Sequence, residues 1–129
     1  MEGREKMEYH GNFLDVEFKD KNLLKKFKIL KTRKSKTNPW THYLVVVEES
    51  EIEDVVKEVK ENLIFPGFYA HLYNQDGSKV IVIFPHRVFR TNKENLREVK
   101  EYGRKLGIPE EQLDIKPLTF EEEENYYKQ

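Results

Sequence analysis

Histidine is the side chain best suited to proton transfer near neutral pH, and it is also a common metal ligand in proteins. Three of the four histidines stand beside aromatic or basic residues, in stretches whose composition favours strands. We expect these stretches to end on one side of a sheet, where their side chains form a small pocket for acid–base chemistry or ligand binding. The candidate ligand-binding residues are Trp40, His42, Tyr69, His71, Tyr73, His86 and Arg87.

Packing of the same aromatic side chains beneath an extra strand is the simpler interpretation, and we prefer it. The sequence has no HExxH or other close-spaced pair of metal ligands, so we expect neither a metal nor a cofactor. His10 falls in a stretch without periodicity near the N-terminus, and we expect it to lie outside any site.

Motifs of the common enzyme classes are missing. The chain has no glycine-rich phosphate loop and no GxSxG motif, and it has no cysteine for a thiolate nucleophile or a disulfide. The sequence therefore points to no catalytic residue, and a non-enzymatic protein is the expectation.

Charge is abundant but unevenly placed. Of the 129 residues 36% are charged, mostly Lys and Glu, a balance typical of proteins from hot environments, and the net charge is −1. Residues 19–36 are strongly basic, whereas residues 121–124 are four consecutive glutamates. No apolar run is long enough for a membrane span and no secretory leader is evident, so we expect a cytoplasmic protein.

The central part of the chain has regular hydrophobic patterns. Residues 41–47 form a β-rich run that is apolar on both faces, and a helical stripe follows from Ser50 to Leu63. Residues 68–74 and 80–84 form a hairpin, for which Asp76-Gly77 predicts a two-residue type I′ turn. That turn opposes His71 to Val82 and Tyr73 to Val80. A second helix, with an apolar face from Leu96 to Leu106, and an edge strand over 114–118 complete the pattern.

This order of elements predicts an α+β fold of the ferredoxin-like, split βαβ type, a two-layer sandwich with strands 43–47 and 80–84 adjacent in its centre. A weaker pattern over 27–33 predicts an extra N-terminal strand. We therefore expect a flexible arm over 1–12, a single domain over 13–120 and a loose acidic tail over 121–129.

Three stretches resemble small uncharacterised microbial proteins with a ferredoxin-like core. They are Asn38-Pro39-Trp40-Thr41-His42-Tyr43, Tyr69-Ala70-His71-Leu72-Tyr73-Asn74 and Tyr102-Gly103-Arg104-Lys105-Leu106-Gly107-Ile108-Pro109-Glu110-Glu111-Gln112-Leu113. The resemblance covers roughly residues 37–118 and implies the fold. No activity, cofactor or partner comes with it.

One face of the predicted hairpin is too apolar to stand in water. It carries Tyr69, His71, Tyr73, Val80, Val82 and Phe84. An exposed patch of that kind is usually covered, either by another chain or by a segment of the same chain such as residues 13–33. We therefore expect an interaction module that forms a homodimer through this open face. A small enzyme or small-ligand sensor is the alternative. An RNA-binding module ranks third, because the net charge makes a nucleic-acid partner unlikely.

Overall fold

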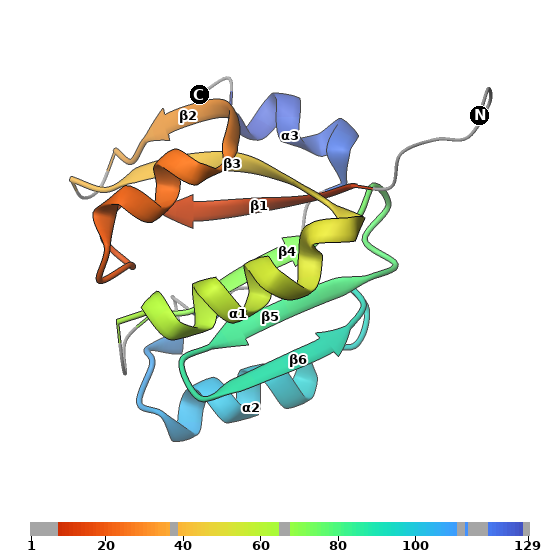
Figure 1. Ribbon diagram of the computed structural model, residues 1–129. Helices are drawn as coiled ribbons and strands as arrows, with labels where there is room; N and C mark the ends of the chain where they lie inside the picture. Colours follow the sequence, from red (N-terminus) through yellow and green to blue (C-terminus); the bar gives the residue numbers. More distant parts are fainter. Residues whose placement is uncertain (1–7, 37–38, 65–67, 111–112, 114–118, 128–129) are drawn as a thin grey trace.

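The computed structural model describes residues 8–36, 39–64, 68–110, 113 and 119–127, and shows an α+β architecture in which helices pack on one antiparallel sheet (Figure 1). The strands are β1 (Glu8–Leu14), β2 (Lys28–Lys34), β3 (Thr41–Glu48), β4 (Ala70–Tyr73), β5 (Val80–Phe84) and β6 (Arg87–Thr91). The helices are α1 (Ile52–Asn62), α2 (Arg97–Lys105) and α3 (Phe120–Tyr127), and the 3₁₀ segments are η1 (Lys21–Lys26) and η2 (Glu49–Glu51). The α+β class predicted from the sequence is confirmed.

The order of the strands in the sheet is β2-β3-β1-β4-β5-β6. The predicted pairing of 43–47 with 80–84 is therefore wrong, because β1 and β4 lie between β3 and β5. β1 takes the place beside β3 that was predicted for residues 80–84, and the two strands pair along seven residues. The ferredoxin-like arrangement is thus not confirmed, and its predicted last strand, 114–118, lies outside the described residues.

The predicted flexible arm over 1–12 is wrong for residues 8–12, and the rest of it lies outside the described residues. Residues 8–12 belong to β1, which lies inside the sheet between β3 and β4. The prediction failed because β1 carries the polar residues His10 and Asn12 and the small residue Gly11, so it lacks an apolar alternation. The additional N-terminal strand predicted over 27–33 is present as β2, at the edge of the sheet.

The hairpin register is as predicted, with His71 opposite Val82 and Tyr73 opposite Val80. The turn is different. Gly77, with φ of 77°, is the only residue with positive φ in the connection, whereas a type I′ turn needs two. The loop instead closes with hydrogen bonds from Asn74 N–H to the Lys79 carbonyl and from Gly77 N–H to the Asn74 carbonyl. The connection is thus longer than a two-residue turn, but it is centred on the same residues, so the register of β4 and β5 is unchanged.

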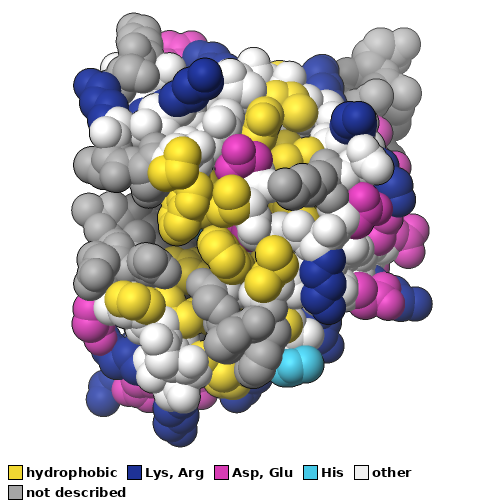
Figure 2. Space-filling model, turned by 90° about the vertical axis from the view of Figure 1, so that its left-hand side faces the viewer, with side chains coloured by type: hydrophobic (Ala, Val, Ile, Leu, Met, Phe, Trp, Pro, Cys, Tyr) yellow, Lys and Arg dark blue, Asp and Glu magenta, His cyan; other side chains and the backbone are white. Residues whose placement is uncertain are grey.

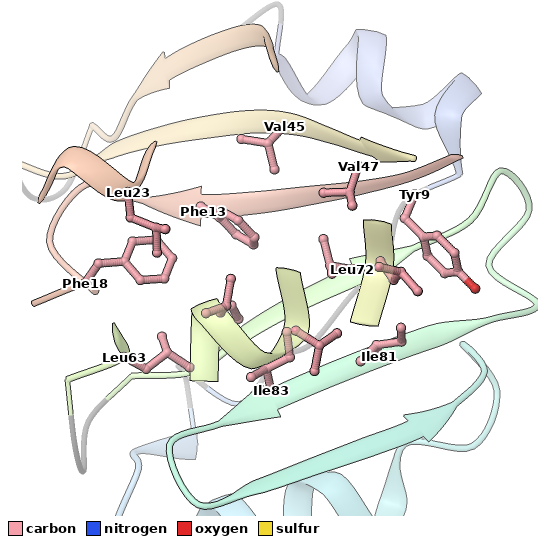
Figure 3. Packing of buried hydrophobic residues seen from close by; sticks show 14 of the residues in the cluster. Tyr9, Phe13, Phe18, Leu23, Val45, Val47, Leu63, Leu72, Ile81 and Ile83 are labelled. Atoms are coloured by element: carbon pink, nitrogen blue, oxygen red, sulfur yellow. The ribbon is translucent and has the colours of Figure 1, made fainter. Parts of the chain in front are cut away.

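One face of the sheet packs against α1 and η1, and we call it the α1 face. Side chains from four strands and from η1 converge on the helix in this core, which Figure 3 shows from close by. Phe13 on β1 meets Phe18 edge to face at 5.4 Å, and Phe18 bridges to Leu63 at the end of α1. The labelled members of this core are Tyr9, Phe13, Phe18, Leu23, Val45, Val47, Leu63, Leu72, Ile81 and Ile83.

The opposite face, which we call the α2 face, carries the side chains that the sequence predicted to be open. The structure covers them: Tyr73, Val80, Val82 and Phe84 are each at most 1% exposed. They pack with Leu96 and Val99 of the α2 region, with Leu113 and with Phe120. The covering segments are therefore C-terminal and are not residues 13–33, which the sequence suggested for this role.

The predicted loose tail is largely the helix α3, which lies over β1, β2 and β3 on the α2 face (Figure 1). Thr119 caps it: the Glu122 amide donates to Thr119 Oγ1 and the Thr119 amide donates to Glu122 Oε1. This reciprocal capping box is a sequence-level signal for a helix start, Thr-x-x-Glu, and it could have revealed α3. The acidic run concealed it, because consecutive glutamates also fit a solvated tail.

Candidate functional site

The predicted site residues lie near one end of the sheet, except Tyr73, which is the last residue of β4 and lies toward the other end. β1 and β5 end there, at Leu14 and Phe84, while β3, β4 and β6 begin there. This end is on the left of Figure 1 and faces the viewer in Figure 2. The sequence therefore grouped these strand ends correctly, even though it placed the strands in the wrong order.

The three candidate histidines do not meet. His42 is on β3 and His86 follows β5, so the intervening β1 and β4 put three interstrand spacings, about 14 Å, between the strands that carry them. Direct metal ligands lie about 2 Å from the ion, so these residues cannot share one coordination sphere. Within the described ranges, no group of three His, Asp or Glu side chains is arranged to hold a metal ion.

His42 is a half-buried member of a polar cluster beneath α3. Its Nδ1 lies 3.3 Å from Asn12 Oδ1, and its ring meets Tyr126 edge to face at 6.2 Å. Tyr127 donates its hydroxyl to the same Asn12 oxygen at 3.0 Å. Burial lowers the pKa of His42, and the neighbouring Arg33 lowers it further. Its contacts therefore hold α3 against the sheet, and its neutral form is favoured.

His71 stacks on Tyr73, with ring centroids 5.8 Å apart. Burial lowers the pKa of His71 to about 4, so the imidazole is neutral at physiological pH. By contrast, His86 is exposed, and Arg87 places its guanidinium 4.3 Å above the centroid of Phe89. His71 thus packs against Tyr73, whereas His86 and Arg87 are exposed at the turn between β5 and β6.

The most connected titratable residues are His10 and Glu123, neither of which is among the predicted site residues, and they join the candidate Tyr73. Glu123 is 4% exposed, accepts a hydrogen bond from the Tyr73 hydroxyl at 2.6 Å, and lies 2.8 Å from Nδ1 of His10. His10 is also buried, and its ring stacks on Phe120 at 3.6 Å. Because the three polar groups satisfy one another in the interior, this network joins β1, β4 and α3 and serves as a structural anchor.

A second buried acid, Glu17, accepts a hydrogen bond from the Leu14 amide at 3.0 Å. Burial raises the pKa of Glu17 well above its ordinary value, and the bond from Leu14 opposes that rise. The side chain is only 2% exposed, so it does not face a ligand from solvent. It helps to shape the bend between β1 and η1, since its carbonyl also accepts from Ile64 N–H at 2.9 Å.

Apolar side chains gather across the same end of the molecule, as Figure 2 shows. Trp40 meets Phe68 at 5.9 Å between ring centroids, and Tyr69 beside it meets Phe84 at 5.3 Å. Two backbone hydrogen bonds hold the neighbouring segments together here. The Asp15 amide donates to the Thr41 carbonyl, and the Ile64 amide donates to the Glu17 carbonyl. The half-buried side chains that we call the strand-end surface are Leu14, Val16, Trp40, Ile64, Phe68 and Tyr69.

A second distinctive surface runs along β2 at the edge of the sheet. Residues 25–36 contain seven lysine or arginine residues and no acidic residue, and most of the strand is exposed. Ile29 and Leu30 are 39% and 43% exposed, the highest values for large hydrophobic residues in the described part of the chain. This strand therefore combines positive charge with accessible apolar side chains.

Comparisons of the chain with models of protein families, with curated proteins and with solved structures find no match. None of the helices in the described ranges is both long and apolar enough to cross a membrane.

Proposed function

We propose that the protein is a non-enzymatic interaction module that self-associates through its strand-end surface. The observation that carries this proposal is the half-exposed cluster of large apolar side chains around Trp40 and Phe68. Contiguous apolar patches on a soluble protein mark sites of association, and aromatic side chains dominate the energetics of such sites.

The arrangement of the titratable groups supports a binding role over a catalytic one. His10 and Glu123 are saturated by contacts within the fold, and His42 takes part in the packing of α3. General acid–base catalysis needs a group within hydrogen-bond reach of a substrate. The buried groups of His10, Tyr73 and Glu123 satisfy one another, which suits them to stabilise the scaffold of a binding surface.

A second copy of the chain is the partner that suits this surface best. The net charge is −1, so two copies do not repel each other strongly at long range. The α2 face does not offer a dimer surface, because the C-terminal segments already bury its apolar side chains. A standard interface needs about 800 Å² from each partner, and Trp40, packed beside Phe68, provides a suitable aromatic anchor.

The test is the mass of the protein in solution across a concentration series, measured by sedimentation equilibrium. We expect a monomer–dimer equilibrium for the unaltered chain and a monomer for the Phe68→Glu variant, because a charge buried at the interface is left unpaired. Ile29→Glu, on the exposed β2 edge, is the matched control and should still dimerise.

Phe68 also packs against the core, so circular dichroism must first show that the variant is folded. If Phe68→Glu does not fold, Val16→Glu provides a second variant on the strand-end surface. A chain that stays monomeric at all concentrations would refute self-association. Equal dimerisation of Phe68→Glu and Ile29→Glu would show that another surface is used.

A further inference from the structure

The outer edge of β2 is a second place where the chain can accept a partner. Among the described strands β2 pairs only with β3, so the backbone groups on its other side face away from the sheet. Such an edge is a template for an additional strand, whose main-chain hydrogen bonds supply affinity while its alternate side chains supply specificity.

The side chains of β2 alternate between the two faces of the sheet in a defined order. Lys28 and Lys31 are opposite Val46 and Leu44 on the α2 face, whereas Ile29 and Thr32 are opposite Val45 and Tyr43 on the α1 face. The register shifts between Ile29 and Lys31, which marks a bulge at Leu30. An incoming strand therefore meets lysines on one face and an exposed isoleucine and a threonine on the other.

Several lysines of β2 have no acidic partner in the part of the chain that the structure describes. In the chain as far as the structure describes it, Lys26 pairs with Glu58, but no carboxylate lies within ion-pair distance of Lys28, Lys31 or Lys34. The opposite edge of the sheet also carries two arginines, of which Arg90 pairs with Glu53 of α1 and Arg87 does not pair with a carboxylate among the described residues. Pairing of β2 with β2 of another copy would therefore oppose like charges directly, and pairing with β6 would bring the lysines against Arg87, which is destabilising.

We infer that β2 binds an acidic, extended peptide segment as an additional antiparallel strand. Charge complementarity selects the partner: glutamate or aspartate on the face that meets Lys28 and Lys31, and β-branched residues on the face that meets Ile29. This interaction is separate from self-association, because the strand-end surface and the β2 edge share no residue.

The probe is a fluorescein-labelled peptide of seven residues with alternating glutamate and valine, and its binding is followed by fluorescence anisotropy. We expect saturable binding, weakened at least about tenfold by the double change Lys28→Glu and Lys31→Glu. The matched control changes the exposed helix residues Lys57 and Lys105 to glutamate, which alters the net charge equally and should leave the affinity within about twofold.

Two further arms separate strand addition from simple attraction of charge. A peptide N-methylated at alternate amides keeps its charge but loses the hydrogen bonds of one edge. Two such peptides, each methylated along a different edge, should differ in affinity. Only the peptide whose free amides face β2 should bind like the unmodified one. Hydrogen exchange of the amides of β2 that point away from β3 should slow when the unmodified peptide binds.

Three results would overturn the inference. The first is equal affinity of the lysine double variant and its helix control. The second is equal binding by both N-methylated peptides and the unmodified one, with no change in hydrogen exchange. The third is preferential binding of a uridine oligonucleotide over the peptide, which would identify β2 as a nucleic-acid surface.

Discussion

Replacement of Glu123 by glutamine tests whether the buried network anchors α3. The carboxylate of Glu123 accepts from the Tyr73 hydroxyl at 2.6 Å and lies 2.8 Å from Nδ1 of His10. Hydrogen bonds to a charged group contribute about 1.5–3 kcal/mol, compared with about 0.5–1.5 kcal/mol for neutral pairs. Glutamine keeps the volume but makes both bonds neutral, so the free energy of unfolding should fall by about 2–3 kcal/mol.

The size of that loss makes it easy to detect. Domains of this kind are stable by about 5–15 kcal/mol in total, and a loss of 2–3 kcal/mol should lower Tm by about 10 °C. Chemical denaturation followed by circular dichroism measures the free energy directly. Glu124→Gln is the matched control on the same helix, because Glu124 is exposed, and it should change stability by less than about 0.5 kcal/mol.

A double-mutant cycle with Tyr73→Phe shows whether the two residues act through each other. The combined loss should be smaller than the sum of the single losses, since both changes remove the same hydrogen bond. If Glu123→Gln costs no more than Glu124→Gln, the network does not hold α3 and our account of the C-terminal helix is wrong.

Two further changes test the interior of the sheet. Because the folded pKa of His71 is about 4, against 6.5 for an exposed histidine, only the unfolded chain takes up its proton between these values. The free energy of unfolding should therefore fall by up to about 3 kcal/mol as the pH drops from 6.5 to 4. His71→Gln should remove this part of the slope in denaturation curves. The raised pKa of Glu17 makes the free energy of unfolding change with pH in the opposite direction. This contribution cancels when the unaltered chain is compared with His71→Gln. An unchanged slope would show that His71 is not buried as a neutral ring. Gly11→Ala should cost about 1–3 kcal/mol by overpacking, because a Cβ there would lie 2.6 Å from Leu72 Cδ2 and 3.1 Å from the His71 carbonyl oxygen. A stable Gly11→Ala variant in thermal melts would contradict the close pairing of β1 with β4.

Short-range patterns in the sequence were reliable where the pattern alone decides the structure. The hairpin register followed from alternation of side chains around residues 76 and 77, and it survived an incorrect turn type because the turn centre was right. The strand over 41–47 was evident because Leu44 and Val45 point to opposite faces and both are buried. These features depend on neighbours a few residues away, and the sequence displays them directly.

The elements that the sequence concealed depend on contacts between distant segments. His10 and Glu123 are separated by 113 residues, and neither has an apolar pattern of its own. Glu123 is one of four consecutive glutamates, and only its position opposite His10 and Tyr73 makes it a buried residue. The order of the strands was missed for the same reason, because nothing local indicates that β1 enters the sheet between β3 and β4.

The candidate site shows the same division. The sequence placed Trp40, Tyr69 and their neighbours at one end of the sheet, because strand directions alone determine which ends coincide. It could not tell that β1 and β4 separate His42 from His86, or that α2 and the C-terminal segments cover the face predicted to be open. The strand-end surface remains after these corrections, and it carries the proposed function.

The intrinsic fluorescence of Trp40 tests that function most directly, since it is the only tryptophan in the chain and lies on the strand-end surface. Emission and acrylamide quenching are measured over a dilution series that spans the monomer–dimer transition. Self-association predicts that quenching weakens and emission shifts to the blue as concentration rises, in parallel with the mass. A Trp40 signal that stays constant while the mass doubles would contradict the proposed interface.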